Sequence, residues 1–254
     1  MSFPNNTYKY DQPGILTAVK MAEYRGQKRP PPPETMILAY QTPLLRHAVK
    51  SQKGKKVDGF PGETYLLGKT DGRVGVAGRF GIGAPMTAVL VEDLAAWGAR
   101  QFVIIGLAGV ISPDLQPGDM TVVDKALRDE GTSHHYLPPQ QYVDASPELT
   151  AVVHQALARQ NIPFAAGPTW TTDAPYRETA GEVAQYQQEG ILTVEMEAAA
   201  LFAVAEYRGL AATAVFCISD SIADGRWQPV ADRKAVERRL FDLFDALIPV
   251  IGGR

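Results

Sequence analysis

Cysteine is almost absent from this sequence: Cys217 is the single one among 254 residues. It cannot form an intrachain disulfide, which suits a reducing compartment. Cys217 lies in the apolar run 211–218, and we predict a small core residue, because a reactive thiol needs an exposed, electropositive setting. Residues 1–10 lack the apolar core of a signal peptide, and no apolar run reaches the length of a membrane span. We therefore expect a soluble, cytoplasmic protein with no membrane partner.

The sequence also lacks a large excess of charge of either sign. Its 25 Lys and Arg nearly balance its 28 Asp and Glu, which gives a net charge of −3. A mildly acidic chain without a basic run argues against a nucleic-acid polymer as partner. His134 and His135 are adjacent, but no Cys or His at ligand spacing accompanies them, so we predict no metal site. The turn at 81–83 lacks the third glycine and the downstream acid of a dinucleotide fingerprint. We therefore predict no dinucleotide cofactor.

The sequence does contain a regular alternation of short apolar runs and helical patterns from residue 35 onward. Residues 1–34 are polar and irregular and end in a proline run, so we predict an N-terminal segment (1–34) followed by one domain (35–254). Predicted strands cover 35–40, 64–69, 73–78, 101–106, 119–126, 164–170, 191–196 and, as the last strand, 211–219. Predicted helices begin near Pro85, Ser146, Tyr176 and Glu197, and the last covers 236–251. This alternation predicts an α/β fold with a mostly parallel or mixed sheet covered on both faces.

Six segments resemble, in this order, a known family. They are GIGAPMTAVLVEDLAAWGAR (81–100), IGLAGVISPDLQPGDM (105–120), RDEGTSHHYLPP (128–139), WTTDAPYRET (170–179), TVEMEAAALFAVAEYRGL (193–210) and AVFCISDSIAD (214–224). Together they resemble the nucleoside phosphorylase family, in its uridine and bacterial purine branch. The resemblance implies a three-layer αβα fold, homo-oligomers that are dimers or hexamers, and cleavage of the N-glycosidic bond of a nucleoside.

The clearest candidate site stands at the predicted strand-to-helix junction Glu195-Met196-Glu197. Open α/β sheets place ligands at the carboxyl ends of their strands. A carboxylate there can accept hydrogen bonds from two vicinal hydroxyls, and a methionine can pack on the sugar face. The resemblance implies that Glu197 and Met196 hold the ribose in this way, with Glu195 beside them. The alternative is structural, with Glu197 favoured by the helix dipole and Met196 in the core.

Cleavage also requires that the negative charge of the departing base be neutralised. Asp220 directly follows the buried strand 211–219. The resemblance to the purine-cleaving branch implies that Asp220 donates a proton toward the imidazole side of the base, which requires a raised pKa. That branch has an assisting arginine thirteen residues later, which is Arg233 here, and Arg226 competes for the role. A helix N-cap is the alternative for Asp220.

The resemblance implies that the stretch 170–179 holds the base, with Tyr176 stacking on it and Arg177 holding a carbonyl. The glutamine and arginine pair of the uridine branch is not present at its usual spacing. This difference and the presence of Asp220 favour a purine.

The sequence departs from the family at the positions that bind phosphate. These positions matter because binding a dianion needs several charge-assisted donors. The stretch 40–44 matches the family's Gly-Asp-Pro-x-Arg turn but contains no arginine. Ile104 occupies the place of a second arginine, Leu107 the place of a hydroxyl residue, and Pro61 lies near that of a third arginine lent by a neighbouring subunit. The usual phosphate cradle is missing.

Substitutes for the cradle are expected among Arg79, Gly81 and Gly109, with Arg46 and His47 near the first strand as further candidates. Backbone N–H groups at a helix N-terminus can also bind an anion.

Three functions remain open. The first is phosphorolysis with a remodelled site, which uses phosphate as co-substrate and no cofactor. The second is hydrolysis, which needs no anion cradle but does need a carboxylate base, for which Glu195 and Glu63 are candidates. The third is nucleoside binding without turnover, against which Glu197 and Asp220 argue.

Overall fold

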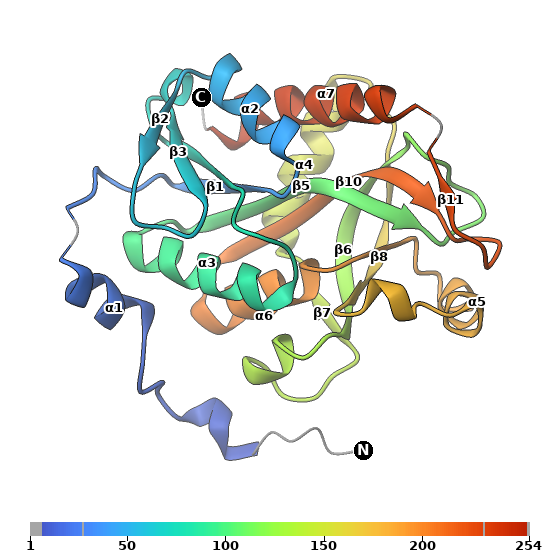
Figure 1. Ribbon diagram of the computed structural model, residues 1–254, viewed down its shortest axis with the longest axis horizontal. Coiled ribbons are helices and arrows are strands. Elements are labelled where there is room, and N and C mark those ends of the chain that lie inside the picture. The colour runs from blue at the N-terminus through green and yellow to red at the C-terminus, as the bar shows by residue number, and fades with distance from the viewer. Residues whose placement is uncertain (1–6, 27, 231, 253–254) are drawn as a thin grey trace.

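A computed structural model describes residues 7–26, 28–230 and 232–252 (Figure 1). The α-helices are α1 (Ala18–Arg25), α2 (Thr42–Ser51), α3 (Ala84–Trp97), α4 (Pro147–Arg159), α5 (Ala180–Gln188), α6 (Ala198–Arg208) and α7 (Arg233–Ile251). The strands are β1 (Thr35–Ala39), β2 (Gly54–Val57), β3 (Glu63–Leu67), β4 (Val74–Gly78), β5 (Gln101–Val110), β6 (Met120–Asp129), β7 (Tyr142–Asp144), β8 (Ala165–Thr172), β9 (Thr193–Glu195), β10 (Ala211–Ser221) and β11 (Gln228–Pro229). Short 3-10 turns are η1 (Thr7–Asp11), η2 (Gly68–Thr70), η3 (Ser133–His135) and η4 (Pro175–Arg177).

The strands form one mixed sheet in the order β11-β10-β6-β8-β9-β5-β1-β4-β3-β2, with β7 on β6. Strand β5 pairs in parallel with β1 and β10, and β6 and β9 each pair in parallel with β8. The remaining pairings, except that of β1 with β4, are antiparallel. Because β10 also pairs with β5, the strands β5, β10, β6, β8 and β9 form a closed ring. The mixed sheet predicted from the sequence is confirmed.

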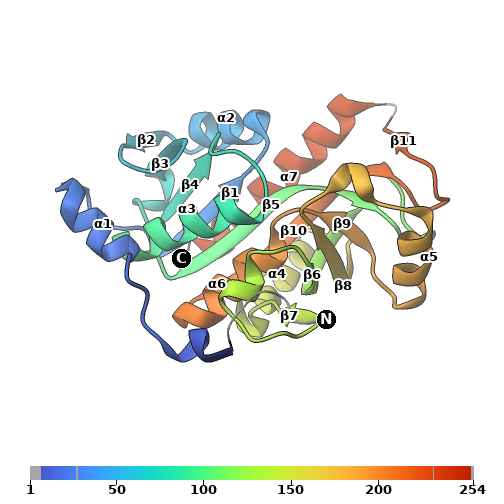
Figure 2. The same cartoon turned by 60° about the horizontal axis from the view of Figure 1, so that its bottom comes forward.

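Helices cover both faces of the sheet, as Figures 1 and 2 show. Helices α2, α4 and α7 bury their apolar side chains on one face, in a cluster that includes Cys217. Helices α3 and α6 pack together on the other face. The three-layer αβα arrangement is therefore confirmed. Burial raises the pKa of the Cys217 thiol to about 11, and the residue is in the core as predicted.

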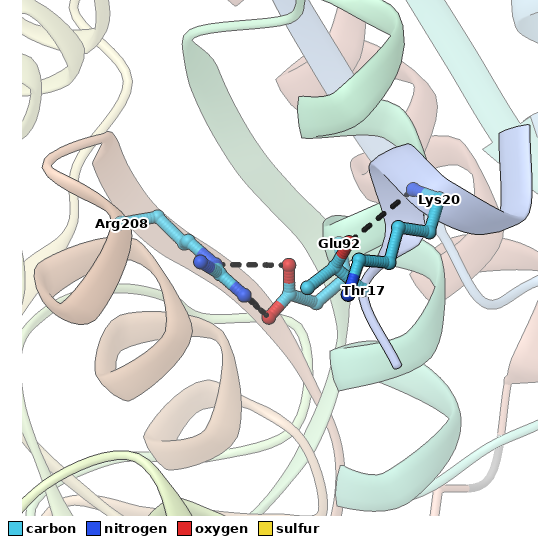
Figure 3. A network of polar contacts seen from close by, with 4 residues as sticks. All are labelled: Thr17, Lys20, Glu92 and Arg208. Atoms are coloured by element: carbon cyan, nitrogen blue, oxygen red, sulfur yellow. Dashed lines mark hydrogen bonds and ion pairs between the residues drawn. The ribbon is translucent and has the colours of Figure 1, made fainter. Parts of the chain in front are cut away.

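Helices α3 and α6, which both begin near the candidate site, are tied together at their far ends. The Arg208 guanidinium on α6 donates two hydrogen bonds, of 2.8 and 3.0 Å, to the Glu92 carboxylate on α3 (Figure 3). This tie fixes the relative direction of two helices whose first turns carry site residues. Within the described ranges, no helix combines the length and apolar character needed to cross a membrane.

The N-terminal segment differs from the irregular structure expected for it. Its described part contains η1 and helix α1, which begins because the Thr17 hydroxyl accepts the Lys20 N–H at 3.2 Å (Figure 3). Helix α1 ends at Gly26, whose φ of 60° closes the last turn. Arg25 then lies 3.6 Å from Asp93 of α3, so the segment packs on that helix.

Several shorter elements were not predicted. Helix α2 has no side-chain cap at its N-cap, and β2, β7 and β11 are short. Strand β11 follows β10, so 211–219 is not the last strand. On α3 the helical spacing of the apolar residues predicts one inward face formed by Met86, Val89, Leu90, Leu94 and Trp97. Instead Val89 is 51% exposed, because the buried face includes Ala88 and Val91.

Candidate active site

A cavity of about 640 Å³ opens at the end of the sheet where β5, β9 and β10 meet. Its wall combines residues of these strands with the loop that leads into α5 and the hairpin between β10 and β11. The lining residues are Gly109, Pro175, Tyr176, Glu178, Thr179, Ala180, Val183, Val194, Glu195, Met196, Asp220, Ile222, Gly225, Arg226 and Trp227. Gly109 keeps the cavity open, since a Cβ there would lie 3.2 Å from Val194 Cγ1 and 3.6 Å from the Asp220 carboxylate.

Glu195 has a structural role at the start of α6. Its Oε2 accepts the N–H groups of Glu197 and Ala198 at 2.7 and 2.8 Å, and so satisfies donors of the first turn. Its Oε1 accepts the Thr171 hydroxyl at 2.5 Å, and Thr171 Oγ1 in turn accepts the Ala199 N–H at 3.0 Å. Thr171 and Glu195 face each other in the pairing of β8 with β9. The two strands thus jointly cap the helix that follows the predicted site.

Replacing Thr171 with valine is expected to destabilise the fold by about 2–3 kcal/mol, because it leaves the buried Ala199 N–H without its acceptor and removes a donor from Glu195. Chemical denaturation measures the loss. The control is Thr172→Val at the neighbouring position, where the hydroxyl accepts one N–H, that of Ala174, at 3.2 Å. A Thr171→Val variant no less stable than the control would contradict this account of the cap.

Glu197 follows Met196 in the chain and connects the site to α3. Its side chain is mostly buried, and Oε1 accepts the N–H of Gly83, the N-cap of α3, at 2.6 Å. Gly83 has a φ of 92°, which favours glycine. Thr87 donates to the Gly83 carbonyl at 3.0 Å and exchanges a 2.6 Å hydrogen bond with the Tyr40 hydroxyl. The end of β1, the start of α3 and the start of α6 therefore form one polar network.

Burial raises the pKa values of the acidic groups in this network. Burial raises the pKa of Glu197 to about 7. Burial, followed by the charge of Glu197, raises the pKa of Glu195, and the three donors on Glu195 oppose that rise. Burial and then the charge of Glu197 also raise the pKa of Tyr40 well above its usual value. The hydroxyl donors of a sugar complement the acceptor oxygens of this network.

Asp220 reaches the cavity because β10 is irregular beside it. The pairing of β10 with β5 shifts between Ile218 and Asp220, and such bulges redirect a side chain. Asp220 Oδ1 accepts the Ser219 hydroxyl at 2.5 Å, and Oδ2 accepts the indole N–H of Trp227 at 2.9 Å. The hairpin that contains Trp227 thus closes over this carboxylate, and Asp220 is not the helix N-cap considered as its alternative.

The loop before α5 forms the outer wall of the cavity. Tyr176 lines it and is fully exposed, which leaves its ring free to stack on a ligand. Arg177 is exposed and is not among the residues described as lining the cavity. Glu178 lines it instead, and burial, with a smaller contribution from the charge of Asp220, raises the pKa of Glu178 to about 7.

The two arginine candidates differ in position. Arg226 lines the cavity from the β10–β11 hairpin, whereas Arg233 is the exposed first residue of α7 and is not among the described lining residues. Of the two arginines considered as partners of Asp220, Arg226 is therefore the one that shares the cavity with it. Glu178 and Trp227 were not predicted as site residues from the sequence. Glu178 lies in the segment 170–179, which carries the family resemblance, and Trp227 lies shortly after the segment 214–224.

The candidate phosphate residues do not converge. Arg79 bonds to Glu63 at 2.8 Å, at a shallow depression outside the cavity. Gly109 lines the cavity, and Gly81, with a φ of 103°, lies in the turn before α3. Ile104 is buried in the apolar core, so the position of the family's second arginine offers no group to a ligand.

In the described part of the chain, no group of three or more His, Cys, Asp or Glu side chains is arranged so that it could hold a metal ion. His134 Nε2 instead contacts the Arg128 carbonyl at 3.2 Å, and His135 contacts Lys9.

Comparison with known proteins identifies the family of the chain. A model of the phosphorylase superfamily matches residues 37–249. Uridine phosphorylase of Haemophilus influenzae is 32% identical over 163 residues, which are 59% of this chain and 65% of that protein. Guanosine phosphorylase of Halorubrum lacusprofundi is 33% identical over 149 residues, which are 57% of this chain and 60% of that protein. The DeoD-type purine nucleoside phosphorylase of Bacillus cytotoxicus is 26% identical over 173 residues, which are 67% and 73% of the two chains.

The match to the first two relatives thus spans less than two thirds of their length. The superfamily model covers most of the described domain, including the strands that end at the cavity.

Proposed function

The chain belongs to the phosphorylase superfamily, and from this we propose that it binds a nucleoside in the cavity and cleaves its N-glycosidic bond by phosphorolysis. Met196 and Glu197 hold the ribose, and Asp220 assists departure of the base. The products are the free base and ribose 1-phosphate. No cofactor is needed, since the reaction transfers a sugar between two nucleophiles.

One observation carries this proposal, which is that Met196 and Asp220 line the same cavity, although Met196 follows β9 and Asp220 lies on β10. Glu197, the other proposed ribose residue, directly follows Met196 and is not among the described lining residues. Glu197 is held at the first turn of α6 by Gly83, so its position does not depend on the ligand. Two groups fixed at opposite ends of the bond to be broken supply orientation and charge stabilisation.

Phosphate as the acceptor is supported by the relatives, which include a uridine phosphorylase and a guanosine phosphorylase. Within this chain, Arg226 is the one basic side chain among the residues described as lining the cavity. The Gly83 N–H at the start of α3 is donated to Glu197, and the N–H groups of Ala84 and Met86 in the first turn are further candidate donors. We propose that these donors replace the arginines of the family's usual cradle.

Hydrolysis is the second candidate, and the apolar side chains of Ile104 and Leu107 favour it, because water needs no anion cradle. Of the two carboxylate bases considered, Glu195 accepts three hydrogen bonds as a helix cap and Glu63 pairs with Arg79 away from the cavity. Neither is placed as a free base, so we rank hydrolysis below phosphorolysis.

Release of free base from purine nucleosides is expected to require phosphate, with the rate falling at least about 100-fold when phosphate is removed, because neither Glu195 nor Glu63 is placed as a free base that could activate water. Chromatography of base and ribose 1-phosphate over a nucleoside panel, with and without millimolar phosphate, measures this. The control is the Glu197→Gln protein purified in parallel, which detects a contaminating enzyme. Equal release without phosphate would establish hydrolysis, and nucleoside binding without any release would favour the binding function.

Three further features belong to the same proposal. Asp220 and the absence of the uridine branch's amide and guanidinium pair favour a purine base. Exposed apolar side chains on α1 and α3, at Val19 and Val89, support a homo-oligomer, with a dimer or hexamer as its expected size. A cytoplasmic location remains the prediction made from the sequence.

A further inference from the structure

Glu178 and Glu182, the first two glutamates after Tyr176, differ in the hydrogen bonds that their carboxylates accept from the described residues. Glu182 accepts the N–H and the hydroxyl of Thr179 at 2.9 and 2.7 Å, which makes it the structural acid of a capping box on α5. Glu178 is half-buried, lines the cavity and has no hydrogen bond or ion pair to the described residues. A carboxyl group placed in this way has its full hydrogen-bonding capacity available to a ligand.

The charged groups around Glu178 set its protonation. Asp220 on β10 accepts hydrogen bonds from Ser219 and Trp227, and in its ionised form it acts on Glu178 together with the charge of Glu182 on α5. Glu195 on β9 and Arg226 on the hairpin line the same cavity. Burial and these two acidic neighbours raise the pKa of Glu178 to about 7, so both of its forms are present near neutral pH.

The two forms of a carboxyl recognise different base edges. A neutral carboxyl presents one donor beside one acceptor, which complements adenine, whose ring N1 accepts and whose amino group donates. A carboxylate presents two acceptors, which complement guanine, whose N1–H and 2-amino group both donate. A bidentate pair of this kind discriminates strongly, because the mismatched base leaves buried polar groups unpaired.

We propose, on the basis of the proposed function, that Glu178 is the residue that selects the base: ionised it binds guanine, neutral it binds adenine, and Asp220 acts on the imidazole side. The position of Glu178 supports this role, since it lines the same cavity as Asp220 and its carboxyl has no hydrogen-bond or ion-pair partner among the described residues. Tyr176 and Trp227, at the rim, leave room for a stacked ring. The guanosine-to-adenosine preference therefore rises with pH.

The test is the ratio of kcat/KM for guanosine to kcat/KM for adenosine between pH 6 and 8.5, a range in which neither base titrates at the edge concerned. In the wild type the ratio is expected to rise about tenfold or more through pH 7. Glu178→Gln, which presents a fixed donor and acceptor, is expected to hold the ratio at its low-pH value. Glu178→Ala is expected to lower kcat/KM for both substrates and to flatten the ratio.

The matched control is Glu182→Gln, which changes the neighbouring carboxyl outside the cavity lining. It should keep a rise of the wild-type size, with the midpoint at a lower pH because one of the two acidic neighbours of Glu178 is removed. A Glu178→Gln variant with the wild-type pH dependence would overturn the inference. If the wild type cleaves no nucleoside, the proposed catalysis fails, and the same ratio is measured as nucleoside affinity by quenching of tryptophan fluorescence. A pH-dependent affinity ratio that Glu178→Gln abolishes would then still support the inference, and its absence would overturn it.

Discussion

Glu197→Gln is expected to lower kcat/KM for nucleosides by about 10³-fold, mainly through KM. The amide oxygen can still accept the Gly83 N–H, so the variant keeps the contact that positions the side chain. It loses the negative charge that two vicinal hydroxyls require. Hydrogen bonds to a charged acceptor contribute roughly 1.5–3 kcal/mol each, and the loss of two such bonds gives a change of this size. Steady-state kinetics and calorimetric binding of the nucleoside measure it.

The same substitution provides its own control for folding. Because burial raises the pKa of Glu197 from 4.5 to about 7, the folded state binds the proton more tightly than the unfolded chain does. Ionisation of Glu197 therefore lowers the stability as the pH rises from 4.5 to about 7, and the full penalty is present above pH 7. Glu197→Gln removes that penalty and should unfold at the same or a higher temperature than the wild type at pH 8. Normal nucleoside affinity in this well-folded variant would refute the role of Glu197.

The pH dependence of wild-type binding follows from the same carboxyl. The ribose is held by the ionised form, so KM is expected to rise as the pH falls below about 7. This trend contrasts with the change in base preference at Glu178, which alters the ratio between substrates rather than the affinity for all of them.

The positions of the candidate site residues were easiest to predict from the sequence where those residues lie at the end of a strand. Glu195 is the last residue of β9, Met196 and Glu197 follow it, and Asp220 lies one residue before the end of β10, so the alternation of strands and helices was enough to place them. The apolar runs themselves define the buried strands, since Ile104 and Phe216 pack in the core from β5 and β10. These predictions depend only on local pattern.

The remainder of the site depends on contacts between distant segments. Gly83 and Glu197 are 114 residues apart, and their hydrogen bond exists only once α3 and α6 pack together. The irregularity beside Asp220 arises from the register of β10 against β5, which no local pattern encodes. Glu178 has the same residue type as Glu182, and what distinguishes them is that Thr179 occupies one carboxylate and the cavity surrounds the other.

Asp220→Asn is expected to lower kcat for guanosine by about 10²- to 10³-fold while KM changes only a few-fold, because general acid assistance acts on the departing base and not on the bound ground state. The amide keeps the shape of the side chain and can still accept one of the two donors, from Ser219 or Trp227. The control is Asp224→Asn on the same hairpin, whose carboxylate accepts the Arg226 N–H and the Gln228 amide outside the cavity lining. This control should keep wild-type kinetics.

A second substrate separates a chemical role from a structural one. 7-Methylguanosine already has a positive charge on its imidazole ring, so its base departs without receiving a proton. If Asp220 neutralises the leaving group, Asp220→Asn should cleave 7-methylguanosine at close to the wild-type rate while its turnover of guanosine collapses. Both rates are measured by absorbance at saturating phosphate. An equal loss on the two substrates would mean that Asp220 mainly holds Trp227 and the β10–β11 hairpin in place, and the proton would then have to come from another group of the cavity.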